Sequence, residues 1–139
     1  MIPHGTFVWN ELMTRDVDAA KRFYEASLGW TFDAMPMPEG GTYWVASSGG
    51  SMAGGMMALD GPQFEGVPSH WFAYIEVDDV DARVAGLEQA GGKLMRPAFD
   101  VANVGRIAIV QDPTGAVVGW MTSVDRAADW DDDEDDDGD

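Results

Sequence analysis

The residues best suited to chemistry are one acid and one histidine on two strand-like segments. Glu11 lies within an apolar run at 7–13, and His70 directly precedes a second run at 71–77. An imidazole titrates near neutral pH, and a carboxyl group among aromatic rings tends to have a raised pKa. Either side chain could act as a general acid or base on a bound small molecule. Both could instead be structural, His70 as a strand-end histidine and Glu11 as a hydrogen-bonded group inside a sheet.

The same two residues are candidate ligands for a metal ion. A zinc or iron site needs about three protein ligands, and Glu76 is a third candidate on the second segment. The chain contains no Cys and only two His, His4 and His70. Disulfides, thiolate metal sites, cysteine nucleophiles and a three-histidine site within one chain are therefore excluded.

Large apolar side chains share the parity of these polar residues. Because side chains two residues apart in a strand point to the same face, Trp9 is predicted to lie beside Glu11. Phe72 and Tyr74 follow His70 with the same parity, and Met121 lies on a further strand. These four residues are predicted to line an apolar ligand pocket, although ordinary core packing would also explain them. Trp120 is expected to point the opposite way, toward a helix or a dimer partner.

Arg106 is a candidate for binding an anionic group. It begins a run that is otherwise apolar, and a guanidinium can hold a carboxylate or phosphate through two parallel hydrogen bonds. A surface ion pair is the alternative, because acids outnumber bases in this chain.

An internal repeat indicates the elements that position these residues. Asp-Val-Asp-Ala at 16–19 recurs at 79–82, and Gly29 recurs as Gly92, both at an offset of 63. Asp16 and Asp79 are predicted helix N-caps, the first helix ending at Gly29 and the second running to about residue 91. Turn residues separate further strands, which are predicted at 31–35, 42–47 and 52–59, and at 93–99, 106–111 and 116–122.

Each half of the chain is therefore predicted to be a βαβββ module, which places the chain in the α+β class. The modules span about residues 5–60 and 69–124, with a linker at 60–69 that is rich in Pro and Gly. Neither half is large enough to bury a core alone, so the modules are expected to share one sheet system within a single domain at 1–128.

The charge is unevenly distributed along the chain. The 25 acids and 8 bases give −17, and residues 129–139 contribute nine acids and no base, which leaves −8 on residues 1–128. The tail is predicted to be a disordered, solubilising segment, with an interaction module as the alternative. An acidic domain without a basic cluster excludes binding to nucleic acid or to an anionic membrane. Without a membrane span or a signal peptide, the protein is expected to be cytoplasmic.

The motifs of both halves resemble one known family. They include Asp-Val-Asp-Ala-Ala-Lys-Arg-Phe-Tyr and Leu-Gly-Trp in the first half, and Val-Asp-Asp-Val-Asp-Ala and Asp-Pro-Thr-Gly in the second. This pattern, over about residues 5–124, resembles the vicinal oxygen chelate superfamily, which includes glyoxalase I, extradiol dioxygenases and bleomycin-resistance and fosfomycin-resistance proteins. The resemblance implies a curved mixed sheet with a concave cleft, and a homodimer.

Many members of that superfamily bind a divalent metal on the first and last strands of each module. The matching positions here are Trp9, Phe72, Gly119 and one position within 55–57, and none of them carries a carboxylate or an imidazole. The resemblance therefore implies a protein without a metal or other cofactor at the family's usual positions.

Two functions follow as expectations. The first is a metal-independent binder of an apolar or aromatic small molecule, with Glu11 and His70 as polar anchors. The second is an enzyme, either a metal-dependent lyase, isomerase or dioxygenase with a displaced metal site, or a metal-free acid/base catalyst. The sequence leaves open whether the protein is catalytic and which compound it binds.

Overall fold

A computed structural model describes residues 2–37, 40–101 and 104–124 of the chain. The predicted acidic tail at 129–139 lies outside the described residues. The chain divides into two compact units, one formed by residues 9–72 and the other by residues 2–8 together with the described residues from 73 onward. Each unit contains most of one repeat.

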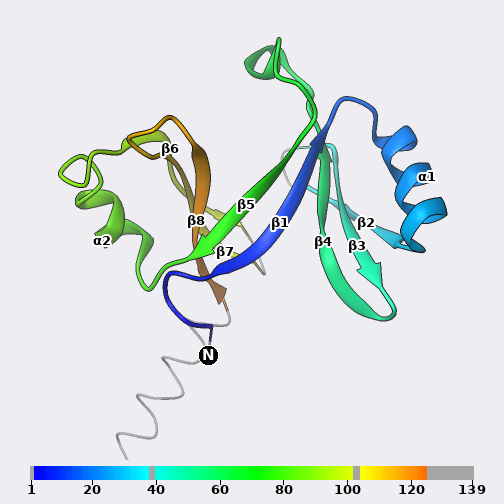
Figure 1. Ribbon diagram of the computed structural model, residues 1–139, viewed down its shortest axis with the longest axis horizontal. Coiled ribbons are helices and arrows are strands. Elements are labelled where there is room, and N and C mark those ends of the chain that lie inside the picture. The colour runs from blue at the N-terminus through cyan, green and yellow to red at the C-terminus, as the bar shows by residue number, and fades with distance from the viewer. Residues whose placement is uncertain (1, 38–39, 102–103, 125–139) are drawn as a thin grey trace, which may run out of the picture. The chain divides into compact units, whose positions relative to one another are not determined.

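The first module has the predicted order of elements (Figure 1). It consists of β1 (Phe7–Thr14), α1 (Val17–Leu28), β2 (Thr31–Pro36), β3 (Thr42–Ser48) and β4 (Ser51–Ala58). Its strands lie in the order β2-β3-β4-β1, with β1 parallel to β4 and the other neighbours antiparallel. A short 3-10 helix, η1 (Pro62–Phe64), follows in the segment predicted as a linker.

The second module repeats this arrangement. It consists of β5 (His70–Glu76), α2 (Val80–Ala85), β6 (Lys93–Val101), β7 (Gly105–Gln111) and β8 (Val117–Ser123). Its strands lie in the order β5-β8-β7-β6, and β5 is parallel to β8. The predicted α+β class and the two tandem βαβββ modules are therefore confirmed.

The repeat extends to single residue pairs. Glu11 on β1 lies opposite Gly55 on β4, and Tyr74 on β5 lies opposite Gly119 on β8. Glu11 and Tyr74 are the positions that the 63-residue offset relates. Corresponding strands of the two modules thus pair in similar registers, with a glycine on the last strand in both.

The first helix has the predicted bounds, and the second is shorter. The Asp16 side chain accepts a hydrogen bond from the Ala19 N–H, and Gly29 closes α1 in a left-handed conformation with φ of 72°. Helix α2 has the same kind of cap, from Asp79 to the Ala82 N–H, but it ends at Ala85.

The prediction that the second helix reaches residue 91 is wrong, because Gly86 ends it early. Glycine loses more backbone entropy than any other residue when it is fixed in a helix, so it disfavours continuing one. At Gly86 and Leu87 the backbone forms i→i+3 hydrogen bonds in place of the α-helical i→i+4 pattern. The Gly86 N–H bonds to the Arg83 carbonyl and the Leu87 N–H bonds to the Val84 carbonyl. Leu87 lies beyond the end of the helix but is buried, as the apolar spacing predicted.

Each helix lies against the sheet of its own module. In the second module Val77, Val80 and Ala108 form a buried cluster, and Trp120 packs against it. The prediction that Trp120 points toward a helix is thus confirmed.

The segment after β4 is held to the end of β1 by one arginine. The Arg15 guanidinium donates to the carbonyls of Val67 at 2.8 Å, Leu59 at 3.2 Å and Phe64. The Arg15 N–H also donates to the Ser69 hydroxyl at 2.9 Å. The predicted linker is therefore fastened to the first module by hydrogen bonds to its backbone.

Among the helices in the described ranges, none is both long and apolar enough to cross a membrane.

Candidate functional site

The most developed polar arrangement in the first module joins Trp9, Tyr43 and Glu11. The Trp9 indole Nε1–H donates to the Tyr43 hydroxyl oxygen at 2.8 Å. The Tyr43 hydroxyl forms a second hydrogen bond with Glu11, which is only 6% exposed. Since a hydroxyl has one proton and the indole only donates, the Tyr43 proton is directed to the carboxylate. The three side chains form a chain of hydrogen bonds ending on an acid.

A glycine makes room for this chain. Gly55 lies opposite Glu11 on one side and opposite Val45 on the other, so it is central among three strands. A Cβ built on Gly55 would fall inside the van der Waals radius of the Tyr43 hydroxyl oxygen and would also overlap the ring. The bare backbone of Gly55 is therefore the surface on which the Tyr43 ring rests.

The environment of Tyr43 keeps its hydroxyl protonated. Burial raises the pKa of Tyr43 well above its usual value of 10.0, and the negative charge of Glu11 raises the pKa further. The hydrogen bond from Trp9 lowers the pKa and is the weaker influence. Tyr43 is therefore a hydrogen-bond donor to Glu11 throughout the neutral and mildly alkaline range.

We expect the Tyr43 hydroxyl to remain protonated at pH 11. The measurement is a pH titration of the protein with 13C-labelled tyrosine, following the Cζ resonance by NMR, with the Tyr43→Phe variant for assignment. In the unfolded chain tyrosine ionises near pH 10, so folding stability should fall by about 1.4 kcal/mol per pH unit above that value. In Glu11→Gln the Tyr43 pKa should decrease. A Tyr43 midpoint near 10 in the native protein would contradict this arrangement.

His70 lies at the start of β5 and is half-buried. Its Nδ1 is 2.8 Å from the Pro68 carbonyl oxygen, which can only accept a hydrogen bond. The proton is therefore on Nδ1, and in the neutral ring Nε2 carries the lone pair. An imidazole fixed in this tautomer can accept a proton or a ligand hydrogen bond at Nε2. The predicted general acid/base role of His70 stays a prediction.

The second module has its own aromatic residue over a glycine. Tyr74 is buried, and a Cβ on Gly119 would overlap its ring. Met121 is buried two residues further along β8 and lies opposite Glu76, whose side chain is fully buried. Glu76 Oε2 accepts hydrogen bonds from the backbone N–H and the hydroxyl of Ser123. Glu76 is thus bonded within its own module.

Arg106 is engaged by two acids of the second module. Its Nε and Nη2 donate to the two carboxylate oxygens of Asp81 at 3.0 and 3.1 Å, and its Nη1 donates to Asp100 at 3.2 Å. These carboxylates raise the pKa of Arg106 above its usual value. The arrangement is the surface ion pair that the sequence left as the alternative, and binding of an anionic ligand by Arg106 stays a prediction.

The predicted site residues divide between the two units. Trp9, Glu11, His70 and Phe72 belong to the first, and Tyr74, Met121 and Arg106 belong to the second. Tyr43, which sequence reasoning missed, connects Trp9 to Glu11. The available signal was Gly55 inside an apolar strand, which indicates close approach by another group but does not identify that group.

A known family matches nearly the whole described chain. The model for the Glyoxalase/Bleomycin resistance protein/Dioxygenase superfamily matches residues 6–119. This range includes the first module and the second as far as the start of β8, and it excludes the acidic tail.

Two curated relatives are similar to most of this chain. CFP32 of Mycobacterium tuberculosis, named as a glyoxylase, is 43% identical over 121 residues, covering 86% of this chain and 46% of that protein. The anthracycline biosynthesis protein DnrV of Streptomyces peucetius is 32% identical over 132 residues, covering 86% of this chain and 48% of DnrV. The chain thus spans about half the length of the curated relatives that it matches.

Solved structures share the fold at low sequence identity. Methylmalonyl-CoA epimerase from Mycobacterium tuberculosis matches with a TM-score of 0.65 and 17% identity, covering 92% of this chain and 96% of the epimerase. A variant of the Streptomyces coelicolor methylmalonyl-CoA epimerase matches with a TM-score of 0.64 and 18% identity, covering 88% of this chain and 99% of that one. At this identity the likeness establishes the fold alone.

The residues at the family's metal positions do not fit a metal ion. Trp9 and Phe72 carry no ligand atom of the kind that a hard or borderline metal prefers. At Gly55 and Gly119 any larger side chain would meet the rings of Tyr43 and Tyr74. Within residues 2–37, 40–101 and 104–124, no group of three or more His, Asp or Glu is arranged to hold a metal.

Proposed function

Because the chain belongs to the Glyoxalase/Bleomycin resistance protein/Dioxygenase superfamily, we propose that it binds a flat aromatic small molecule through the first-module site, without a metal. The observation that carries this proposal is the hydrogen-bond chain from Trp9 through Tyr43 to Glu11. Apolar surfaces with a few placed polar groups are typical of ligand sites.

The chemistry of the site defines the polar part of the ligand. A carboxylate accepts hydrogen bonds, as Glu11 does from Tyr43, so the site suits a ligand that carries a donor such as a phenol, an alcohol or an amine. The Trp9 ring offers an apolar face for stacking, since its Nε1–H already donates to Tyr43. The proposed ligand class is therefore an aromatic compound bearing hydroxyl or amino groups.

The name of one relative, DnrV, bears on this ligand class, whereas that of CFP32 does not. DnrV is named for anthracycline biosynthesis, and CFP32 is named as a glyoxylase. DnrV is thus named for a pathway to an aromatic natural product. The likeness to DnrV supports an aromatic ligand for this chain.

The test is calorimetric titration with 2,6-dihydroxyanthraquinone, a flat aromatic probe whose phenolic hydroxyls lie too far from its own carbonyls to bond to them and so are available as donors. We expect saturable binding, weakened by Glu11→Gln and by Tyr43→Phe about 10-fold each, because a hydrogen bond to a charged group contributes about 1.5–3 kcal/mol. Glu88→Gln is the matched control, since Glu88 is an exposed acid of the second module. Binding that all three variants retain unchanged would place the ligand elsewhere.

Metal independence is tested on the same samples. Elemental analysis of purified protein should find no stoichiometric transition metal, and a chelator should leave probe affinity unchanged. A bound metal whose removal abolishes probe binding would favour the alternative, a metal-dependent lyase, isomerase or dioxygenase with a displaced site. A His70→Ala variant belongs in this series, since loss of a metal or of turnover in it would assign His70 to that chemistry.

The remaining predicted contacts extend this proposal. Phe72, which belongs to the same unit as Trp9 and Glu11, is proposed as a further apolar contact of the ligand, to be tested by substitution with the same probe. Tyr74 and Met121 as apolar ligand contacts and Arg106 as a polar one stay predictions for the second module, each tested by its own single substitution. A cytoplasmic location is also part of the proposal.

A further inference from the structure

Helix α1 has an apolar side that its own module does not cover. None of its 12 residues is buried, and Phe23 and Leu28 are 61% and 56% exposed. A helix of a globular domain ordinarily buries a continuous apolar stripe against its neighbours. The apolar residues of α1 are thus only partly covered within the described part of the chain.

Aromatic rings around α1 form one connected group, which we name the α1 aromatic cluster. Tyr24 is at its centre, with ring centroids 4.9 Å from Phe23, 5.0 Å from Trp30 and 5.8 Å from Trp71. Trp71 is 45% exposed, and its Nε1–H donates to the Tyr24 hydroxyl at 3.3 Å. Phe32 completes the cluster beside Trp30. Large exposed aromatic groups of this kind are enriched in protein–protein interfaces.

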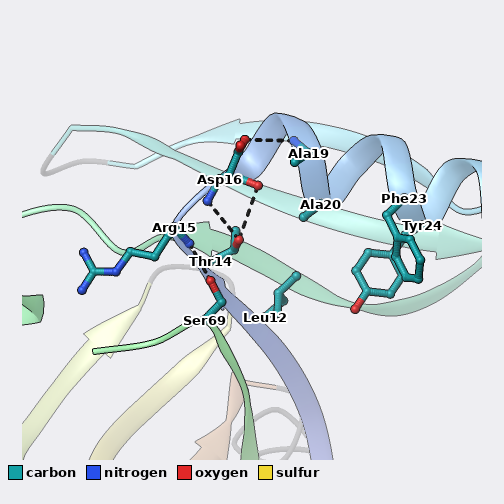
Figure 2. Close-up of a pocket in the computed structure, with 9 residues that line it drawn as sticks. All are labelled: Leu12, Thr14, Arg15, Asp16, Ala19, Ala20, Phe23, Tyr24 and Ser69. Carbon is teal, nitrogen blue, oxygen red and sulfur yellow. Dashed lines mark hydrogen bonds between the residues drawn. The ribbon is translucent and has the colours of Figure 1, made fainter. Parts of the chain in front are cut away.

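An open depression of about 340 Å³ adjoins this cluster (Figure 2). Its apolar lining consists of Leu12 on β1 and of Ala19, Ala20, Phe23 and Tyr24 on α1. Its polar lining consists of Thr14, Arg15, Asp16 and Ser69. The two alanines leave space where larger side chains would fill it. The patch therefore presents an exposed aromatic ring, Phe23, beside a recess of its own.

A ring and a recess on one patch suit a two-fold dimer. In such a dimer the same patch faces itself, so each copy must offer both a protruding group and a place to receive it. Phe23 is the protruding group, and the recess beside Ala19 and Ala20 is the place that receives it. The two-fold axis makes this contact occur twice, once in each direction.

The charge distribution also favours a second copy at this position. Residues 15–25 contain three bases (Arg15, Lys21, Arg22) and three acids (Asp16, Asp18, Glu25), a net charge of zero. The described residues outside this segment contain 11 acids and 4 bases, a net charge of −7. Two copies therefore repel each other less when they meet at this segment than when they meet at the more acidic remainder.

We propose that the α1 aromatic cluster is a homodimer interface, in which Phe23 of each copy enters the recess beside α1 of the other. The family resemblance implies dimers in general, whereas this inference specifies the surface. It does not depend on the proposed ligand-binding function, because Trp9, Tyr43 and Glu11 are not members of the cluster.

The test is the oligomeric state of the full chain and its variants, by light scattering after size exclusion and by native mass spectrometry. The wild type should be a dimer at micromolar concentration. Phe23→Asp and Phe23→Lys should both dissociate it and raise the dimer Kd about 100-fold or more, because two aromatic anchors are lost per dimer. Because Asp adds a negative charge and Lys a positive one, an effect shared by the two variants is due to loss of the ring and not to charge repulsion.

Val117→Asp is the matched control, since Val117 is 43% exposed on the second module and receives the same charge. It should leave the dimer intact, and circular dichroism should show that all variants are folded. A monomeric wild type would overturn the proposal, as would a dimer that survives both Phe23 substitutions or that Val117→Asp dissociates. The dimer proposal is tested by oligomeric state and the ligand proposal by affinity for the anthraquinone probe. The failure of one can therefore be distinguished from the failure of the other.

Discussion

Replacing Gly55 with alanine is expected to lower the free energy of unfolding by about 3 kcal/mol, at the upper end of the range for overpacked sites. The added methyl group would occupy the space of the Tyr43 hydroxyl and ring. Tyr43 must then move away, which also separates its hydroxyl from Trp9 and Glu11. The cost therefore combines steric strain with the loss of buried hydrogen bonds. Urea unfolding at pH 7 measures it.

Two further variants establish the cause of this effect. Gly86→Ala adds the same methyl group where the nearest atom is 3.9 Å away and φ is −96°, so it should be neutral or stabilise by about 0.5 kcal/mol. In a Tyr43→Ala background the ring is absent, so Gly55→Ala should cost at least about 1 kcal/mol less than in the wild type. Equal costs in the two backgrounds would show that Tyr43 does not rest on Gly55.

The sequence predicted those features that depend on neighbouring residues. Asp16 and Gly29 bound α1 because capping is decided within one turn of the chain. Strand alternation likewise placed Trp9 and Glu11 on one face, and the structure links both to Tyr43. Helix α2 was overestimated because the periodicity of apolar residues continues past Gly86 although the helical backbone does not.

The candidate site itself depends on contacts between distant strands. Tyr43 lies on β3, which is not a neighbour of β1, so its contact with Trp9 spans 34 residues in sequence and crosses β4. Periodicity within a strand gives no information about the register between strands. The pairing of Glu11 with Gly55 and the place of Tyr43 over that glycine therefore required the structure.

The same reasoning applies to charged residues. Arg106 was an isolated base in the sequence, whereas the fold brings Asp81 from α2 and Asp100 from β6 to its guanidinium. No sequence pattern marks Arg15, yet its guanidinium donates hydrogen bonds to three carbonyls of the segment after β4. In both cases the partners lie on other elements, so no local pattern indicates them.

Tyr43→Phe is expected to lower the free energy of unfolding by about 3 kcal/mol at pH 7. The substitution keeps the ring over Gly55 but removes the hydroxyl that accepts from Trp9 and donates to Glu11. Leaving a buried carboxylate without one of its hydrogen-bond donors lowers the free energy of unfolding by about 2 kcal/mol or more, which is more than for a neutral group. Loss of the acceptor for the Trp9 indole N–H adds about 1 kcal/mol. Glu11→Gln alone should cost less, because a neutral amide at this site needs less compensation.

The chain provides a matched control for this substitution. Tyr24→Phe removes a hydroxyl that also accepts from a tryptophan, Trp71, but at a longer distance of 3.3 Å and at a position that is exposed in the monomer. It should cost no more than about 0.5 kcal/mol. The contrast between the two tyrosines separates the effect of the buried carboxylate from that of an indole–phenol hydrogen bond.

A double-mutant cycle on Tyr43→Phe and Glu11→Gln measures the interaction directly. The cost of Tyr43→Phe should fall by about 1–2 kcal/mol in the Glu11→Gln background, since the charged acceptor is already gone. A coupling within error of zero, or a Tyr43→Phe cost no larger than that of Tyr24→Phe, would mean that the phenol does not stabilise the carboxylate. The proposed ligand site would then lose its polar anchor, because an acid that Tyr43 does not hold has no fixed position from which to bind a ligand donor.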